Sequence, residues 1–247
     1  MKVFLFILIF SYSFNLFGQS SDEEQRILYR LENNYSIYFH SSGYGINYSN
    51  FWYKTGYKQY LLDLDFSIFK DAKEIRRFHP INFDEAKGYR YGKLNSLSIL
   101  RIGLGQQIVK HDKADKKSIY LRTIKSFGLS LGLAKPVYLK IIDSISDNMI
   151  YISDKRYDPY NHGVDNIYGR SSLLKGFSKI SPYPGVFFKY ALNIDYGDRQ
   201  QEVKTIEAGV VLDFYFKELD IMAFNDNKNY LLNFYLKFGI GNRWNKK

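Results

Sequence analysis

A strict alternation of apolar and polar residues over long runs is the feature that most constrains the fold of this chain. Successive side chains of a β-strand point to opposite faces, so such a run predicts a strand with one apolar and one polar face. The alternation is clearest over 185–197 and returns at 206–216, 230–240, 60–68 and 126–133. The apolar face of the clearest run consists of Val186, Phe188, Tyr190, Leu192, Ile194 and Tyr196. The chain is therefore predicted to be all-β.

Three segments with less regular alternation, 35–47, 94–109 and 137–143, bring the predicted strands to eight. Turn-like segments separate most of them, which favours an antiparallel up-and-down barrel. Two connections are longer, 71–93 and 144–184. Counting from the periplasm places the turn 110–117 and the connection 144–184 outside the cell and 71–93 on the periplasmic side. A long periplasmic connection is unusual, so ten strands is the alternative.

The beginning of the chain resembles a secretory signal peptide. Lys2 precedes an apolar stretch that runs from Val3 to Phe17 with small polar interruptions, followed by Gly18. The stretch is too short for a typical membrane span, which favours export over an uncleaved helix. We expect residues 1–19 to be the signal peptide and residues 20–247 to form one barrel domain. The chain has no cysteine, which excludes disulfides and thiolate metal sites.

The polar faces of the predicted strands distinguish a membrane barrel from a soluble one. They combine charged residues with glycines, as the interior of a small closed barrel requires when side chains fill it. A soluble, lipocalin-like barrel, with its apolar face inward, is the alternative. Buried charges must pair, so we predict a charge network that plugs the lumen, formed by Asp63, Asp65, Arg101, Lys189, Asp195, Glu207, Asp213 and Lys237.

The net charge of +10 raises the question of an anionic partner. Export argues against nucleic acid and favours lipid and the phosphates of lipopolysaccharide in the outer membrane. The basic turn after the strand 94–109 is the candidate contact, with Lys110, Lys113, Lys116 and Lys117.

Two residues are candidates for catalysis, because some small outer-membrane barrels are enzymes. A serine nucleophile needs a base within hydrogen-bond reach, and Ser42 shares a strand face with His40. The alternative interpretation of His40, a histidine in a polar barrel interior, is favoured. Asp158, His162 and Asp165 match no fixed metal-ligand spacing. The chain is predicted to be non-enzymatic, with no cofactor and no metal.

Four segments of the chain carry a family resemblance: Phe39-His-Ser-Ser-Gly-Tyr-Gly45, Lys73-Glu-Ile75, the run from Tyr91 to Arg101 and the run from Gly128 to Pro136. They resemble segments of uncharacterised small outer-membrane barrels of Bacteroidota and, more loosely, of PorT-like and OmpA-type barrels. The resemblance implies an outer-membrane location and an accessory role in the envelope, in secretion or assembly machinery with protein partners. A narrow solute channel and a lipid A-modifying enzyme or protease are the alternatives.

Overall fold

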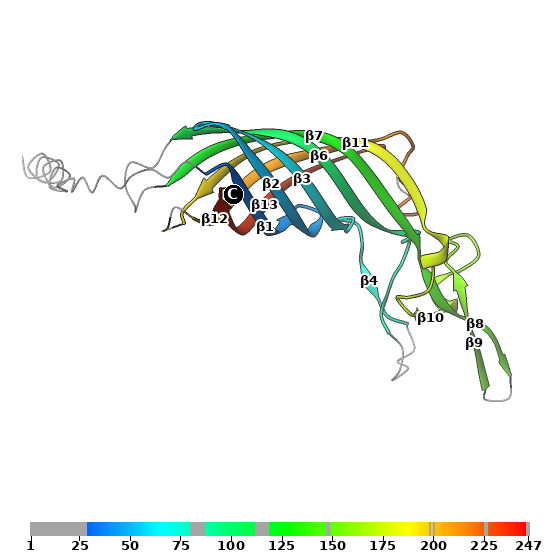
Figure 1. The fold of residues 1–247 in the computed structure, drawn as a ribbon. Coiled ribbons are helices and arrows are strands. Elements are labelled where there is room, and N and C mark those ends of the chain that lie inside the picture. The colour runs from blue at the N-terminus through cyan, green and yellow to red at the C-terminus, as the bar shows by residue number, and fades with distance from the viewer. Residues whose placement is uncertain are drawn as a thin grey trace, which may run out of the picture.

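The structure is a computed structural model that describes residues 29–79, 87–111, 119–146, 149–197, 199, 201–224 and 227–245. Eight antiparallel strands close into a barrel in the order β1-β13-β12-β11-β7-β6-β3-β2 (Figure 1). The barrel closes where β1 pairs with β13, from Leu31 opposite Trp244 to His40 opposite Tyr235. The predicted fold class, an all-β antiparallel barrel with eight strands, is confirmed. The predicted signal peptide, residues 1–19, lies outside the described residues.

The barrel strands have the following bounds: β1 Leu31–His40, β2 Gly43–Thr55, β3 Lys58–Phe69, β6 Asn95–His111, β7 Tyr120–Pro136, β11 Ser181–Asp195, β12 Glu202–Tyr215 and β13 Tyr230–Trp244. Neighbours in the chain are neighbours in the barrel, as an up-and-down barrel requires. The elements outside the barrel are β4 Arg76–Arg77, β5 Tyr89–Arg90, β8 Tyr138–Ser146, β9 Met149–Arg156, β10 Ile167–Arg170 and the short 3₁₀ turns η1 Val164–Asn166 and η2 Phe177–Lys179.

Two of the predicted strands are wrong, although their errors cancel in the count. The segment 35–47 holds two strands, because β1 ends at His40 and β2 starts at Gly43. Gly43 makes this tight turn with a φ of 149°, and a Cβ there would come within 2.0 Å of the Ile68 carbonyl oxygen. The segment 137–143 lies in β8, which pairs with β9 and β10 in a separate sheet.

The corrected strands change which connections share an end of the barrel. We call one end the terminus end. It holds the start of β1, the end of β13 and the connections 56–57, 112–119 and 196–201. The other, the loop end, holds the connections 41–42, 70–94, 137–180 and 216–229 (Figure 1). The prediction that 71–93 and 144–184 lie on opposite sides is wrong, because it counts 137–143 as a third barrel strand between them, whereas only β6 and β7 cross the barrel there.

The loop end carries the additional structure. The sheet β10-β8-β9 and the pair β4-β5 extend away from the barrel in Figure 1. They enclose a small apolar core formed by Tyr89, Leu139, Ile141, Tyr157 and Ile167. Burial raises the pKa of Tyr157 to about 12, as expected for a phenol in an apolar core.

A segment of the connection 216–229 folds over the barrel mouth at the loop end. Leu219, Ile221 and Met222 are buried against lumen residues that include Leu97 and Ile99. Beside this apolar cap, Lys93 forms an ion pair of 2.5 Å with Glu74. Burial lowers the pKa of Lys93, while the Glu74 carboxylate opposes that shift. The mouth is thus covered by packed side chains.

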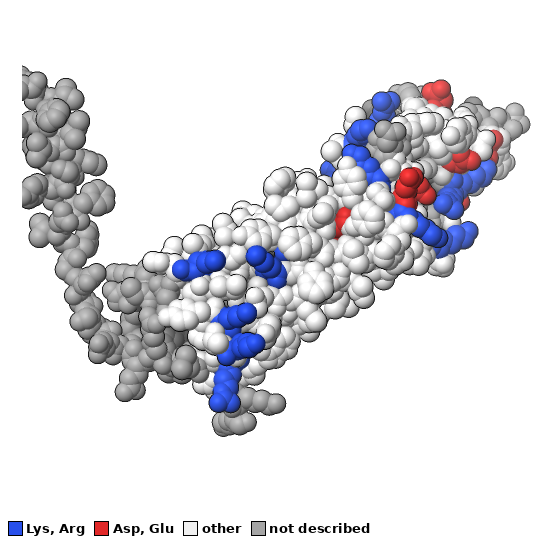
Figure 2. All heavy atoms as spheres, turned by 90° about the horizontal axis from the view of Figure 1, so that it is seen from above, with Lys and Arg blue, Asp and Glu red and all other residues white. Residues whose placement is uncertain are grey.

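The outer wall of the barrel is apolar between two charged ends. On β7 the outward residues Phe127 and Leu129 are 69% and 70% exposed, and the outward run is bracketed by Lys125 and Lys135. A strand segment of this length, at ~3.3 Å per residue and a tilt of ~40°, covers about 25 Å of height. Figure 2 shows charged residues gathered toward the two ends of this face, with an almost uncharged wall between them. No helix in the described ranges is long and apolar enough to cross a membrane.

Candidate functional site

The lumen of the barrel holds the largest group of buried charges in the described chain. In the barrel strands the buried basic side chains are Arg101, Arg122, Lys189, Lys237 and Arg243, and the buried acidic ones are Glu32, Asp63, Asp65, Asp195, Glu207 and Asp213. All eight residues predicted for the lumen network lie among them. The lumen nearly balances its own charge, so the excess of basic residues in the sequence lies elsewhere.

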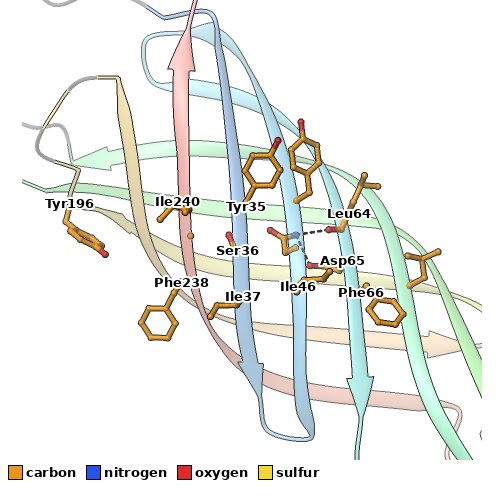
Figure 3. A pocket seen from close by; sticks show the side chains of 14 residues that line it. Tyr35, Ser36, Ile37, Ile46, Leu64, Asp65, Phe66, Tyr196, Phe238 and Ile240 are labelled. Atoms are coloured by element: carbon orange, nitrogen blue, oxygen red, sulfur yellow. Dashed lines mark hydrogen bonds between the residues drawn. The ribbon is translucent and has the colours of Figure 1, made fainter. Parts of the chain in front are cut away.

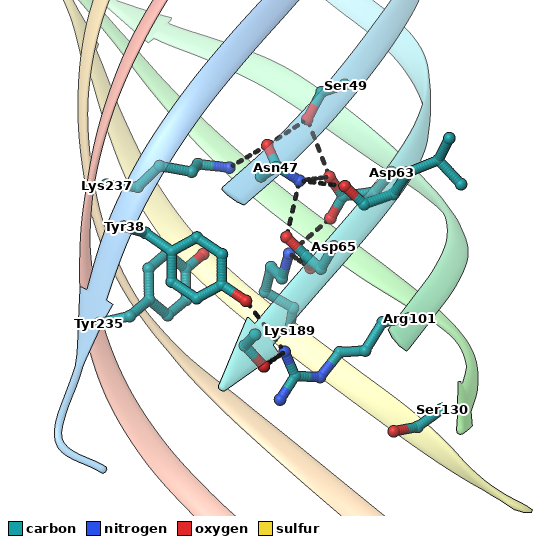
Figure 4. Close-up of polar contacts among 12 residues, drawn as sticks. Tyr38, Asn47, Ser49, Asp63, Asp65, Arg101, Ser130, Lys189, Tyr235 and Lys237 are labelled. Atoms are coloured by element: carbon teal, nitrogen blue, oxygen red, sulfur yellow. Dashed lines mark hydrogen bonds and ion pairs between the residues drawn. The ribbon is translucent and has the colours of Figure 1, made fainter. Parts of the chain in front are cut away.

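The centre of the network joins strands that are not neighbours in the wall. The Nζ atom of Lys189, on β11, lies 2.6 Å from Asp63 Oδ2 and also pairs with Asp65, both on β3 (Figure 4). The side-chain amide of Asn47, on β2, donates hydrogen bonds to the same two carboxylates at 2.6 and 2.7 Å. Ser49 donates a further hydrogen bond of 2.8 Å to Asp63. Both carboxylates are therefore desolvated and fully engaged.

A second ion pair lies beside this centre. Lys237 Nζ is 2.8 Å from Glu207 Oε1, and the Tyr235 hydroxyl donates to the same oxygen at 2.7 Å. Lys237 also donates to the side-chain oxygen of Asn47 at 3.3 Å. Asn47 thus links the Lys237 pair to the carboxylates of β3.

The guanidinium group of Arg101 makes a two-pronged contact toward the loop end. Its Nε and Nη2 atoms donate to the two carboxylate oxygens of Asp213 at 2.7 and 2.8 Å. Its Nη1 atom donates to the Tyr38 hydroxyl at 3.2 Å. Such planar pairs fix both partners in orientation as well as distance. The contact ties β6 to β12 across the lumen.

A separate ion cluster closes the terminus end of the lumen. Arg122 contacts Glu32 at 2.9 Å and Asp195 at 2.6 Å. Arg243 contacts Glu32 at 2.8 Å and also pairs with Asp195. Of these four residues, only Asp195 was predicted. Arg122 and Arg243 lie on the lumen face just beyond the predicted strand bounds. Extending the alternation backward along the chain from Ser126 reaches Arg122, and extending it forward from Lys237 reaches Arg243.

Apolar side chains fill the space between the charged layers. One buried cluster includes Tyr38, Phe51, Leu61, Ile124 and Phe187. A void remains beside Tyr38, Asp65 and Arg101, with a volume of about 10 Å³. One water molecule needs at least about that much room. Packed apolar and charged side chains therefore fill the space around this void.

The two catalytic candidates meet only in the turn between β1 and β2. The backbone N–H of Ser42 donates to His40 Nδ1 at 3.3 Å. Within the described residues, no hydrogen bond joins the Ser42 hydroxyl to His40. The described chain also holds no group of three or more His, Asp or Glu side chains that fits a metal ion. His40 therefore accepts a backbone hydrogen bond within the turn that joins β1 to β2.

The lysines predicted to contact lipopolysaccharide belong to the connection after β6. Lys110 lies in the last part of β6, at the terminus end, while Lys113, Lys116 and Lys117 lie outside the described residues. The extracellular position expected for this turn is wrong relative to the connection 137–180, because the two lie at opposite ends of the barrel. The cause is the segment 137–143, which is predicted as a barrel strand but lies in β8, outside the barrel.

A hollow of about 700 Å³ lies on the outer wall and not in the lumen. Tyr35 and Ile37 of β1, Ile46 of β2 and Phe238 and Ile240 of β13 line it (Figure 3). These side chains belong to the outward apolar face, and Tyr35 packs on Tyr48 with ring centroids 5.0 Å apart. Asp65 also borders the hollow, but its carboxylate is already engaged by Asn47 and Lys189 in the lumen.

Comparison with known proteins finds similar solved structures but no similar sequences. No family model and no curated protein sequence matches the chain. Solved structures with a similar fold include Neisserial surface protein A, at 10% identity over 87% of this chain and 97% of that chain, with a TM-score of 0.47. Others are Ail, the attachment invasion locus protein of Yersinia pestis (7%, 87% and 97%, 0.38), and the N-terminal β-barrel domain of Pseudomonas aeruginosa OprF (8%, 87% and 96%, 0.37).

Proposed function

We propose that this protein is a non-enzymatic β-barrel of the bacterial outer membrane, with a closed lumen and a loop end that docks an envelope protein. The observation that carries the proposal is the division of side chains by the wall. The buried charges of the barrel strands face inward and pair, whereas the outward face is apolar over about 25 Å, the height of the apolar band of a membrane barrel. A soluble barrel has the reverse arrangement.

The orientation follows from the lengths of the connections. In outer-membrane barrels the short turns face the periplasm and the longer loops face outward. The loop end, which holds the long connections 70–94, 137–180 and 216–229, is then extracellular, and the terminus end is periplasmic. In this orientation Lys110 faces the inner leaflet, so its anionic partner would be a phospholipid headgroup and not lipopolysaccharide.

The loop end suits a docking role because it presents exposed aromatic side chains on ordered structure. Tyr160 and Phe224, from different connections, pack edge to face with centroids 5.8 Å apart, and both are more than two-thirds exposed. Clustered exposed apolar residues on a folded surface mark interaction sites. The resemblance to PorT-like barrels favours a partner in secretion or assembly machinery.

Purification from native outer membranes after brief cross-linking tests the docking role. The Tyr160→Ser, Phe224→Ser variant is expected to lose a partner that the wild-type protein retains. The control Tyr57→Ser changes an exposed tyrosine at the terminus end and is expected to retain the partner. An identical set of cross-linked proteins for all three chains would contradict docking at this surface.

A further inference from the structure

The stretch 172–179 at the loop end presents apolar side chains that nothing in the described structure covers. It follows β10, includes η2 and precedes β11. Leu173, Leu174 and Phe177 are 63%, 78% and 57% exposed. Lys175 and Lys179 alternate with them and are also exposed. An apolar and basic pattern of this kind needs a partner that has both apolar and anionic parts.

Lys135 fastens this stretch to the outer side of the barrel wall. On β7, Ala134 points into the lumen cluster, so Lys135 points outward. Its Nζ atom donates to the carbonyl oxygens of Leu173 and Lys175 at 2.6 and 3.5 Å and lies 4.8 Å from the centroid of the Phe177 ring. The stretch therefore lies beside the wall and not across the barrel mouth.

Gly176 allows the stretch to lie this close. Its φ is 91°, and a Cβ there would come within 2.8 Å of the Pro136 carbonyl oxygen and 3.2 Å of the Tyr138 ring. Lys175 is held in addition by an ion pair with Asp154 of β9. The position of the stretch is thus determined by several contacts to β7, β8 and β9.

The height of the stretch on the wall indicates what covers it. Lys135 marks the loop-end limit of the outward apolar run on β7, and Lys125 marks the other limit. If this run spans the apolar layer of the membrane, Lys135 lies at the surface of that layer. Apolar side chains held there can reach acyl chains, and lysines can reach lipid phosphates, which is the arrangement of an interfacial segment.

We propose that residues 172–179 form an anchor in the outer leaflet, in which Leu173, Leu174 and Phe177 enter the acyl region and Lys175 and Lys179 lie beside lipid headgroup phosphates. This inference rests on the proposed membrane location. It adds a lipid-binding surface to the loop end, which also carries the surface assigned to a protein partner.

Single spin labels measure the depth of this stretch, because the chain contains no cysteine to remove. Leu174→Cys reports on the stretch, Leu129→Cys on the middle of the wall and Tyr160→Cys on the exposed loop end. Each labelled protein is placed in liposomes that contain lipopolysaccharide, and accessibility to oxygen and to a water-soluble nickel chelate is measured. The ratio of oxygen to nickel accessibility is expected to be several-fold higher at 174 than at 160.

The control at 129 separates the two proposals. A lipid-like label at 129 with a water-like label at 174 would overturn the anchor and leave the membrane barrel standing. A water-like label at 129 would overturn both. The variant Lys135→Met is expected to make the label at 174 more accessible to nickel while the label at 129 stays unchanged. Should this variant fail to fold, Gly176→Ala disturbs the same position and carries the same expectation.

Discussion

The ammonium group of Lys189 on β11 lies 2.6 Å from a carboxylate oxygen of Asp63 on β3, two strands that β7 and β6 separate in the barrel wall. The pair therefore crosses the lumen and does not run along the wall. With the Arg101 to Asp213 pair from β6 to β12, it braces the barrel internally. The two pairs thus join strands from opposite sides of the wall through the middle of the lumen.

Removing the central cation should destabilise the barrel strongly. Lys189→Met leaves Asp63 and Asp65 buried without their main partner, and breaking a buried pair from one side costs about 3–5 kcal/mol. Urea unfolding of the protein in liposomes, followed by tryptophan fluorescence and by gel mobility, measures the loss. The control Lys125→Met changes an outward lysine and is expected to shift the unfolding free energy by less than about 0.5 kcal/mol.

Neutralising both the lysine and its two aspartates should restore much of the unfolding free energy that Lys189→Met loses. In Lys189→Met, Asp63→Asn, Asp65→Asn no unpaired charge remains in the lumen. The unfolding free energy of this triple variant is expected to exceed that of Lys189→Met alone. A triple variant less stable than the single one would show that ion pairing is not what holds these residues.

The lumen should also resist added volume at Gly128. A Cβ at this position would come within 2.1 Å of the Ile102 carbonyl oxygen and 2.4 Å of the Gly103 Cα atom. Gly128→Ala is expected to lower the unfolding free energy by about 1–3 kcal/mol, as overpacking of a filled interior does. Gly56→Ala is the matched control, because its Cβ would meet no atom within 4 Å.

A charge on the outward face tests whether that face contacts lipid. Leu129→Lys places an ammonium group in the middle of the apolar run of β7, which costs about 2–4 kcal/mol at the bilayer midplane. Urea unfolding of the variant in liposomes measures this loss of unfolding free energy. Tyr160→Lys adds an identical charge at the exposed loop end and is expected to have little effect. Equal stability of the two variants would argue for an aqueous outer face.

Labelling of intact cells tests the orientation. A membrane-impermeant maleimide is expected to react with Tyr160→Cys at the loop end and to leave Tyr57→Cys at the terminus end unlabelled until the outer membrane is opened. Both positions are exposed, so exposure to solvent does not explain a difference. Reaction at position 57 in intact cells, with protection at 160, would reverse the assigned orientation.

Period-two alternation predicts the strands and their faces because the barrel wall divides lipid-facing from lumen-facing side chains along each strand. The same logic contains the signal for the missed turn. Outward residues have odd numbers in β1, up to Phe39, and even numbers in β2, from Tyr44. Such a change of phase requires a turn or a bulge between them. A two-residue turn between apolar runs has little other signal in the sequence.

Other features lie beyond what the sequence pattern determines. The alternation over 137–143 is real, because β8 is a strand, but a period cannot tell a barrel strand from one that continues outside the barrel. The pairing of Lys189 with Asp63 depends on the tilt and stagger of eight strands after closure. The tether from Lys135 to the carbonyl oxygen of Leu173 depends on the path of a long connection, which has no periodic signal.

Single-channel recording in planar bilayers tests the closed barrel most directly. The protein is first shown to be folded and inserted by its heat-dependent shift in gel mobility, and a general porin serves as the positive control for conductance. The ion pairs of Lys189, Lys237, Arg101 and Arg122 predict no stable conductance steps at any applied voltage the bilayer tolerates. Reproducible unitary steps from the folded wild-type protein, absent from protein-free bilayers, would contradict the filled lumen and favour a channel.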